Sequence, residues 1–412
     1  MSVTSDKIIE KLFFTAGLTA GMTCIGLYSK NGGITLFTLI QLLLVLAAVF
    51  LRRPAIQGDR INSPFFVLII CIAISPVINC FILPPLWQNR SLKDLLSNIL
   101  GLASFYLLYG RKDILKYRGH FIKGLKINFV IQAFWTVAQF ISGHLFGVSL
   151  NYYIGLYMPK VLEVTEVSGL TWERAELSLV LIIGYILFED KLFMRLLAIV
   201  CLLLTGSRTA LIMASVLVLF TFNYKGIFLR KANRGIRLKD AAVVLIAIVL
   251  LVCFSKTIFD MFSKTFYGIK NYRHNGSGMA HFQLYEKVFL ILTNISLPNI
   301  LFGFSGGCSG YPYSVYVGRN VGLTWSVEST ILSYLFSYGI VGLASWFIWM
   351  MKSAKVSIMN RQNDIGKLFL VIVIGSFFYS LLSNWGLTDL LILAETMREP
   401  ENKPQYHSFC ET

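Results

Sequence analysis

The stretch "LLLTGSRTALIMASVLVLF" (Leu202–Phe220) is almost entirely apolar, yet Arg208 stands near its middle. Insertion scales put the cost of an arginine at the centre of a membrane helix at about 2.5–3.5 kcal/mol. The apolar run from Leu192 to Phe222 is, however, longer than the roughly 20 residues that cross a bilayer. Gly206 is suited to a turn, and the Ser or Thr beside it can cap a new helix. We therefore predict two helices joined at "TGSR", with Arg208 in the first turn of the second.

The same apolar character extends along the whole chain of 412 residues, which is 56% hydrophobic and only 14% charged. With a mean hydropathy of +0.67 and recurring apolar runs, this composition is typical of membrane proteins. We predict an all-α fold, a polytopic integral membrane helical bundle of about eleven or twelve transmembrane helices, beginning with a helix over 12–28. The transmembrane domain covers residues 1–397 and includes a long, partly helical outer loop at 259–326. The polar tail, residues 398–412, is expected to be disordered.

The basic residues indicate how the chain is oriented in the membrane. With the N-terminus in the cytoplasm, most of the 37 Lys and Arg residues fall on inner segments, including loops predicted at 111–126 and 225–239. The formal net charge of +16 is therefore interpreted as a topology signal and as attraction to anionic lipid heads, and nucleic-acid binding is not expected. The seven cysteines show no paired spacing, so neither a disulfide framework nor a CxxC metal site is predicted.

Arg208 falls on the outer side in this orientation, at the end of a helix where the helix dipole disfavours a cation. Free backbone N–H groups and a guanidinium then point at the same place, which is the chemistry of an anion-binding site. Ser207 and Thr209 flank this position. Two other interpretations remain open: Arg208 reaches the outer lipid head groups, or it pairs with Glu173 or Glu328.

The outer loop 259–326 contains the amphipathic stretch "MAHFQLYEKVFLILTNI" (279–295), which predicts a helix on the membrane surface or over the bundle. The loop "FGFSGGCSGYPYS" (302–314) follows, and its glycines suit close approach of the backbone to a ligand. Tyr311 and Tyr313 could stack on sugar rings, although aromatic residues are also common in membrane-interface belts. The apolar face of the amphipathic helix is predicted from Phe282, Tyr285, Val288, Phe289 and Leu292.

Four stretches resemble the O-antigen ligase and polymerase family of bacterial envelope glycosyltransferases, in the order expected of it. "VSGLTWERAELSLVLII" (167–183) is similar to the Gly-Leu-Thr-x-Glu segment that precedes a helix in many polymerases. "LLLTGSRTALI" (202–212) resembles the signature hairpin of the family. "HFQLYEKVFLILTNISLPNILFGFSGG" (281–307) is similar to the amphipathic outer helix with its Gly-rich turn, and "VESTILSYLFSYGIVGLASWFI" (327–348) to the helix after it.

The resemblance implies a GT-C-like bundle in the bacterial inner membrane, with the active site facing the periplasm. Ligases tend to carry His-Asn at the top of the late helix, whereas this chain has Glu328 and Ser329, and the difference favours a polymerase. Such an enzyme transfers the growing glycan from undecaprenyl diphosphate onto a repeat unit carried by a second undecaprenyl diphosphate. The implied partners are these two lipid-linked oligosaccharides, membrane lipids and a protein that regulates chain length. No cofactor and no metal are expected.

A diphosphate leaving group requires positive charge that holds it more strongly as the bond breaks. The sequence shows no outward-facing Asp-x-Asp or His cluster that would recruit a metal for this purpose. Arginine is therefore expected to supply the charge. Arg208 is the first candidate and Arg273 the second, and Arg174 and Arg319 are further cations on the outer side.

The reaction also requires a base for the attacking sugar hydroxyl. Glu328 is the predicted base, although a glutamate at this helix start could instead serve the helix dipole or pair with an arginine. Glu173 and Glu176 are the next candidates, and Glu173 could instead orient Arg208 or bind sugar. The other residues predicted to bind diphosphate or sugar are Ser207, Thr209, Tyr311 and Tyr313.

Two alternative functions remain. An O-antigen ligase would attach finished chains to the lipid A core instead of joining repeat units. A transporter or flippase for lipid-linked oligosaccharides belongs to another class and would place charged residues deep inside several helices. The predicted helix centres are almost free of charge, which favours an enzyme.

Overall fold

The structure of the chain, a computed structural model, is mostly α-helical. It describes residues 3–29, 32–52, 63–99, 104–158, 163–189, 191–221, 263, 276–318, 327, 329–359, 363–377, 386 and 390–393. Within these residues a single antiparallel hairpin is the β-structure, so the predicted all-α character is confirmed for the described part of the chain.

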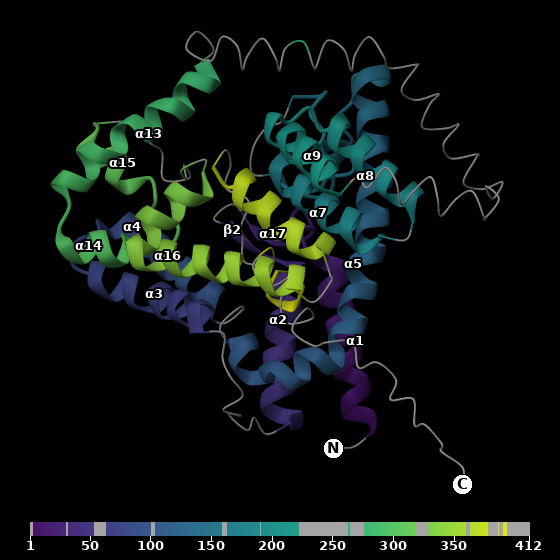
Figure 1. Cartoon of the computed structure of the whole chain (residues 1–412), viewed down its shortest axis with the longest axis horizontal. Helices are drawn as coiled ribbons and strands as arrows, with labels where there is room; N and C mark the ends of the chain where they lie inside the picture. The colour runs from purple at the N-terminus through teal and green to yellow at the C-terminus, as the bar shows by residue number, and fades with distance from the viewer. Residues whose placement is uncertain are drawn as a thin grey trace.

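The elements up to residue 158 are α1 (Val3–Thr19), β1 (Gly26–Ser29), β2 (Gly32–Thr35), α2 (Leu36–Ala47), a π-helical turn (Ala48–Arg52), α3 (Ser63–Asn79), α4 (Pro85–Ser97), α5 (Ser104–Phe146) and α6 (Leu150–Tyr153). Those that follow are α7 (Arg174–Leu187), α8 (Leu192–Leu204), α9 (Arg208–Thr221), α13 (Gly276–Asn294), α14 (Leu297–Phe302), α15 (Tyr311–Tyr316), α16 (Thr330–Met359) and α17 (Asn363–Gly375). Figure 1 shows α5 and α7–α9 on one side of the molecule, α4 and α13–α15 on the other, and α16 and α17 between them.

The first helix lies along α5, and the two backbones approach closely at two glycines. A Cβ atom on Gly17 would overlap the carbonyl oxygen of Phe121, and one on Gly124 would overlap that of Phe14. Small residues that allow this approach are typical of helix pairs in membranes. The α5 side of the contact is a buried stripe at helical spacing, formed by Ile114, Tyr117, Phe121 and Leu125.

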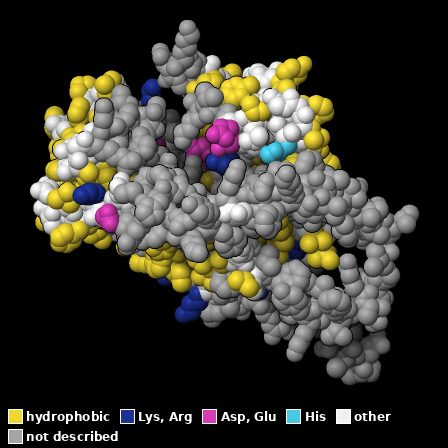
Figure 2. All heavy atoms as spheres, turned by 90° about the horizontal axis from the view of Figure 1, so that it is seen from above, with side chains coloured by type: hydrophobic (Ala, Val, Ile, Leu, Met, Phe, Trp, Pro, Cys, Tyr) yellow, Lys and Arg dark blue, Asp and Glu magenta, His cyan; other side chains and the backbone are white. Residues whose placement is uncertain are grey.

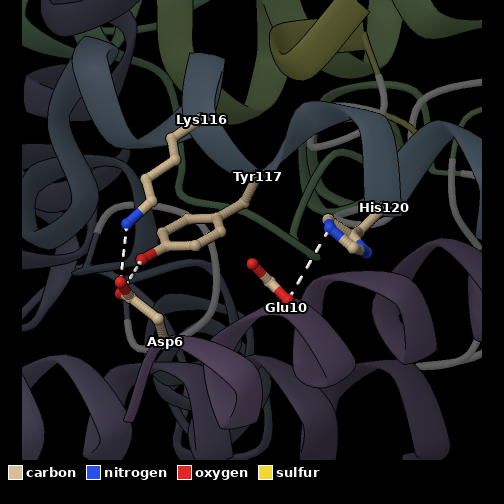
Figure 3. A network of polar contacts seen from close by, with 5 residues as sticks. All are labelled: Asp6, Glu10, Lys116, Tyr117 and His120. Carbon is tan, nitrogen blue, oxygen red and sulfur yellow. Dashed lines mark hydrogen bonds and ion pairs between the residues drawn. The ribbon is translucent and has the colours of Figure 1, made fainter. Parts of the chain in front are cut away.

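One end of the α1–α5 contact carries a group of charged and polar side chains (Figure 3). Lys116 Nζ donates to Asp6 Oδ2 at 2.9 Å, and the Tyr117 hydroxyl donates to Asp6 Oδ1 at 2.7 Å. These hydrogen bonds hold the pKa of Asp6 below its usual value. His120 Nε2 lies 3.9 Å from Glu10 Oε2, one turn further along both helices. The network therefore supports the register that the glycine contacts set.

Two boundaries in this region differ from the sequence predictions. The loop predicted at 111–126 is helical, because α5 continues through it with its apolar stripe buried against α1. The charges in this segment favour a loop on local grounds, but those described fit beside the stripe: Lys116 pairs with Asp6 of α1 at 2.9 Å, and Lys123 is exposed. The helix predicted over 12–28 instead runs from Val3 to Thr19, and Gly21, with a φ of +75°, turns the chain toward β1.

The helices α7, α8 and α9 are consecutive neighbours joined by short connections, so α8 runs antiparallel to the other two. The connection between α8 and α9 consists of Thr205, Gly206 and Ser207, and Gly206 has a φ of +61°. The predicted break at "TGSR" is confirmed, as is the position of Arg208 in the first turn of α9.

The long helix α16 is broken at Gly339, whose φ of +70° is not helical. A helix break leaves backbone carbonyls without intrahelical partners. Two N–H groups of the Gly-rich turn at 303–310 donate to two such carbonyls of α16, at 2.7 and 2.9 Å. Gly303 and Gly339 lie inside this contact, where a Cβ atom on either would overlap the backbone of the other segment. The turn and the kink therefore form one packed unit.

The described residues form two apolar cores, and α16 contributes to both. The larger includes α1–α3, α5, α7–α9 and α17, and the smaller lies between α4 and α13–α16. Among the side chains of α13 that the structure describes, Leu284 and Ile291 are buried, whereas Phe289 is 77% exposed. Val288 and Leu292 of the predicted apolar face pack against the smaller core, whereas Tyr285 and Phe289 are exposed, so contact of this face with the membrane stays a prediction. A neighbouring stripe of the helix faces α15, where the Tyr313 hydroxyl donates to the backbone of α13.

Two segments of the described helices are long and apolar enough to cross a membrane, Ile114–Phe146 and Thr330–Val356. Several shorter helices are also apolar, among them Leu192–Leu204. Figure 2 shows apolar side chains over much of the described part of one face, with few charged ones between them. A surface of this kind suits contact with lipid. The larger number of spans expected from the sequence stays a prediction.

Candidate functional site

Two helices begin with an arginine at the same end of the α7–α9 group. Arg174 opens α7 and Arg208 opens α9, and α8 runs antiparallel to both. The positive ends of two helix dipoles therefore lie at one end of the group, which favours an anion there. We define the candidate site as this end together with the loop at 163–173 that leads into α7.

The loop at 163–173 is held by side-chain amides from α5 and α6. Gln139 Oε1 accepts two backbone N–H groups of the loop, at 3.2 and 2.7 Å, and Gln132 Oε1 accepts a third at 2.8 Å. Asn151 Nδ2 donates to Gly169 O at 2.9 Å, and Gly169 has a φ of +66°. These buried side-chain amides satisfy backbone N–H and C=O groups of the loop that have no partner in a helix or sheet, so the irregular loop is stable beside the helices.

The carboxylate of Glu176 lies where this loop meets α7 and the turn after α1. Thr23 Oγ1 donates to Glu176 Oε2 at 3.0 Å, and Trp172 N–H donates to the same oxygen at 3.2 Å. Trp172 N–H also lies 2.8 Å from Thr23 Oγ1, which closes a triangle of three groups. Glu173 N–H adds a further backbone hydrogen bond, so Glu176 caps the start of α7 as the glutamate of a capping box does.

Glu176 stands in the first turn of α7, ahead of the apolar run at 177–187, and its side chain is partly exposed. Burial, together with the nearby carboxylate of Glu173, raises the pKa of Glu176 to about 7. The hydrogen bonds from Thr23 and from the backbone act in the opposite direction. A carboxyl group that titrates near neutral pH can take up and release a proton under physiological conditions.

Three aromatic rings lie close to this carboxylate. Tyr28 and Tyr157 stack with 4.1 Å between ring centroids, and Trp172 meets both rings edge-on at 5.9 and 6.2 Å. All three side chains are partly exposed. Rings with a polar edge suit contacts to sugars. Neither Tyr28 nor Tyr157 was predicted, because they stand far apart in the sequence and only the fold brings them together.

Arg174 and Glu173 were both predicted as binding residues. The guanidinium of Arg174 forms an ion pair with Glu166 Oε1 at 2.7 Å, which ties the loop to the start of α7. Its charge is therefore already balanced within the chain. Glu173 is the N-cap residue of α7 and has an extended backbone. The structure thus places both residues at the candidate site, with Arg174 in a supporting position.

At the start of α9 the backbone of Arg208 is described, and its side chain lies outside the described part of the structure. Ser207 Oγ accepts the N–H of Ala210 at 3.4 Å, which confirms the predicted helix cap. Thr209 is 7% exposed, so it offers little surface to a ligand.

The two tyrosines that follow the Gly-rich turn, both in α15, differ in their surroundings. Tyr313 is 1% exposed, its hydroxyl donates to Leu284 O at 2.8 Å, and its ring meets Phe336 edge-on at 5.3 Å. A buried ring has no face for a sugar, so Tyr313 is a packing residue and its predicted stacking role is corrected. Tyr311 is partly exposed, beside Trp87 at 5.7 Å, and its role stays a prediction.

Glu328, Arg273 and Arg319 lie outside the described residues, so their predicted roles stay predictions. The neighbours of Glu328 are described, and both Val327 and Ser329 are buried at the start of α16. Among the described residues, no group of three or more His, Cys, Asp or Glu side chains is placed to hold a metal ion.

A second polar cluster, on α4, was not predicted. Asp94 Oδ2 accepts Asn98 Nδ2 at 2.8 Å and the Tyr338 hydroxyl at 3.4 Å. Arg90 precedes Asp94 by one helical turn and lies against Gly307. The spacing of Arg90 and Asp94 in "NRSLKD" places both side chains on one helix face, and this is the signal that could have revealed the cluster.

The chain matches no protein-family model and no curated protein sequence. The resemblance to O-antigen polymerases therefore rests on the motifs in the sequence alone.

Proposed function

We propose that this chain is a membrane glycosyltransferase that polymerises lipid-linked oligosaccharide repeat units, such as those of O-antigen or a related surface polysaccharide. The donor is the growing glycan on undecaprenyl diphosphate, and the acceptor is one repeat unit on the same kind of carrier. The reaction takes place at the periplasmic face of the bacterial inner membrane, within a multi-pass bundle whose N-terminus is cytoplasmic.

The observation that carries the proposal is the end of the α7–α9 group. Two helix N-termini that each open with an arginine lie at this end, beside a carboxyl group whose pKa is about 7. A departing diphosphate needs fixed positive charge, and an attacking hydroxyl needs a base. Both kinds of group are placed at one end of the same three helices, next to rings that suit a sugar.

In the proposed mechanism, Arg208 and the free N–H groups of α9 bind the diphosphate of the donor. A hydroxyl of the acceptor sugar attacks the anomeric carbon, its proton passes to Glu328, and the bond to the diphosphate oxygen breaks. The lipid diphosphate leaves with the electron pair of that bond. The charge on the leaving oxygen grows in the transition state, so the contact with Arg208 becomes stronger as the reaction proceeds. Glu176 is the second candidate for the base.

The direct test is Arg208→Ala and Arg208→Lys, together with Glu328→Gln, in cells that lack the native gene, with surface polysaccharide resolved on a gel. We expect loss of chains longer than one repeat, because lysine does not replace a bidentate fork and loss of one such contact lowers turnover by about 10²–10³-fold. Arg118→Ala, on the distant part of α5, should leave the distribution of polysaccharide chain lengths on the gel unchanged.

The pattern of products separates the alternatives. Loss of a polymerase leaves single repeat units on the lipid A core, loss of a ligase leaves free polymer, and loss of a transporter leaves neither at the surface. Full-length chains in both Arg208 variants would remove the proposed mechanism.

A further inference from the structure

We propose that Arg90, where α4 meets the Gly-rich turn at 303–310, binds a phosphate group. That phosphate belongs either to the diphosphate of a lipid-linked substrate or to the head group of an anionic lipid. Its assignment to the substrate rests on the proposed function, whereas phosphate binding by Arg90 does not.

The guanidinium of Arg90 is only partly satisfied by its contacts within the described structure. Its Nη1 atom is buried and has no hydrogen-bond partner, and Arg90 forms no ion pair with a described carboxylate. By contrast, Arg174 pairs with Glu166 at 2.7 Å and Lys116 pairs with Asp6 at 2.9 Å. Asp94 acts on Arg90 electrostatically without forming an ion pair with it, so the partly buried guanidinium lacks a hydrogen-bonded acceptor for Nη1. A phosphate, with several acceptor oxygens, can provide one.

The position of Arg90 is fixed by its neighbours. Its guanidinium lies 5.9 Å from the ring centroid of Trp87, and a Cβ atom on Gly307 would come within 3.2 Å of Arg90 Cγ and 3.3 Å of Nε. One residue further along α4, Ser91 Oγ lies 2.6 Å from Ser305 Oγ. Ser305 itself has a φ of +87°, a strained value for a residue with a side chain. The helix and the turn thus hold Arg90 in one place.

Asp94 is the carboxylate closest to Arg90 along α4, and it is used elsewhere. It accepts hydrogen bonds from Asn98 and from Tyr338, and a side chain on Gly306 would displace it. Burial lowers the pKa of Arg90, while Asp94 and Cys308 act in the opposite direction. This direction is the one expected of a cation that is removed from water without sufficient compensation.

The proposed reaction gives this position a use. Polymerisation requires two lipid diphosphates at the same time, one on the donor and one on the acceptor. Arg208 is the first residue of α9, a helix that packs in the larger core, whereas Arg90 belongs to α4, which packs in the smaller core. Two separated arginines therefore match two separate carriers.

The test is isothermal titration of the purified full-length chain, in a non-ionic detergent, with inorganic pyrophosphate and with geranylgeranyl diphosphate. We expect Arg90→Gln to weaken the binding of one equivalent by about tenfold or more, the size expected for loss of a charged hydrogen-bonded pair. Lys93→Gln removes the same charge from an exposed position of the same helix and should change the Kd by less than about twofold. Arg90→Lys keeps the positive charge but loses the two-pronged guanidinium, so its Kd should lie between those of Arg90→Gln and Lys93→Gln.

The two sources are distinguished by nanodiscs with and without phosphatidylglycerol. Stabilisation by phosphatidylglycerol that is lost in Arg90→Gln assigns the head group, and loss of prenyl diphosphate binding assigns the carrier. Unchanged affinity of Arg90→Lys and Arg90→Gln for both diphosphates, with no change in nanodiscs, overturns the proposal, and Arg90→Lys decides if Arg90→Gln does not fold. If the wild-type chain binds pyrophosphate through Arg90 but makes no polysaccharide, the phosphate site at Arg90 is supported and the proposed polymerase function is rejected.

Discussion

Glu176 accepts hydrogen bonds from Thr23 and from the backbone at Trp172, yet its pKa is raised to about 7. Hydrogen bonds to a carboxylate favour its charged form, and removal from water disfavours it. Here burial has the larger effect. Because the folded-state pKa lies above the usual value of 4.5, the folded chain binds this proton more tightly than the unfolded chain does.

The stability that depends on this proton is fully present below about pH 4.5 and is lost as the pH rises through about 7. We expect the thermal midpoint of the wild type to fall more steeply across this range than that of Glu176→Gln, which keeps an acceptor oxygen for Thr23. The measurement is unfolding in detergent at a series of pH values. Glu286→Gln, at an exposed position of α13, should keep the wild-type slope, and equal slopes in all three proteins would contradict the prediction.

Ser207 offers a second test at the scale of one residue. Its hydroxyl accepts the N–H of Ala210, so Ser207→Ala should lower the free energy of unfolding by about 0.5–2 kcal/mol. Ser215 lies in the same helix, where its exposed hydroxyl donates to Leu211 O. Ser215→Ala should change stability by less than about 0.5 kcal/mol, and an equal loss in the two variants would show that the cap does not hold α9.

At the scale of helices, the α1–α5 contact depends on backbones that approach each other without side chains between them. Gly124 faces the backbone of α1, whereas Gly119, in the same helix, has nothing within 4 Å of a Cβ atom built on it. Replacement by alanine should therefore lower stability at Gly124, where the new side chain is crowded by α1, and raise it at Gly119, where only the better helix propensity of alanine acts.

We expect Gly124→Ala to destabilise the protein by about 1–3 kcal/mol through overlap with α1. Gly119→Ala should stabilise it by about 0.5–1 kcal/mol, the gain of alanine over glycine within a helix. Thermal unfolding of the two purified variants measures both effects. An equal loss of stability in Gly119→Ala and Gly124→Ala would show that close approach of the α1 backbone does not explain the effect at Gly124.

The elements that could be predicted are those fixed by local sequence. The break at "TGSR" depends on Gly206 and a capping serine, both of which act within one turn. The continuous α5 differs from the prediction because the basic residues of 111–126 favour a loop on local grounds, and the apolar stripe between them has a role only once α1 lies against it. Glu176 was predicted as a further candidate for the base, but its raised pKa depends on burial and on Glu173 in the folded chain. Arg90 was not predicted, because its position against Gly307 of the distant Gly-rich turn exists only in the fold.

At the scale of the whole molecule, the predicted orientation places the end of α3 on the outer side of the membrane. Cys80 lies just beyond this end and is exposed, whereas the other described cysteines, Cys24, Cys71, Cys201 and Cys308, are buried. A thiol at Cys80 therefore reports which side of the membrane this end faces.

We expect a membrane-impermeant maleimide to label Cys80 in spheroplasts of a variant in which Cys253 and Cys410 are serine. With Cys80 also replaced, Arg118→Cys on the predicted inner side should be labelled only after the membrane is broken. Equal labelling of both positions before lysis would reject the orientation on which the periplasmic site depends.

The contact between the Gly-rich turn and the break in α16 has a consequence for how ligands reach this region. Two N–H groups of the turn are already committed to carbonyls of α16, and Gly303 and Gly339 leave no gap between the segments. If the turn moved away as a flap, the carbonyls of Phe336 and Ser337 would lose these two hydrogen bonds, which is costly in apolar surroundings. A ligand that binds beside the turn therefore meets a fixed backbone, and selectivity at this place depends on the side chains around the turn.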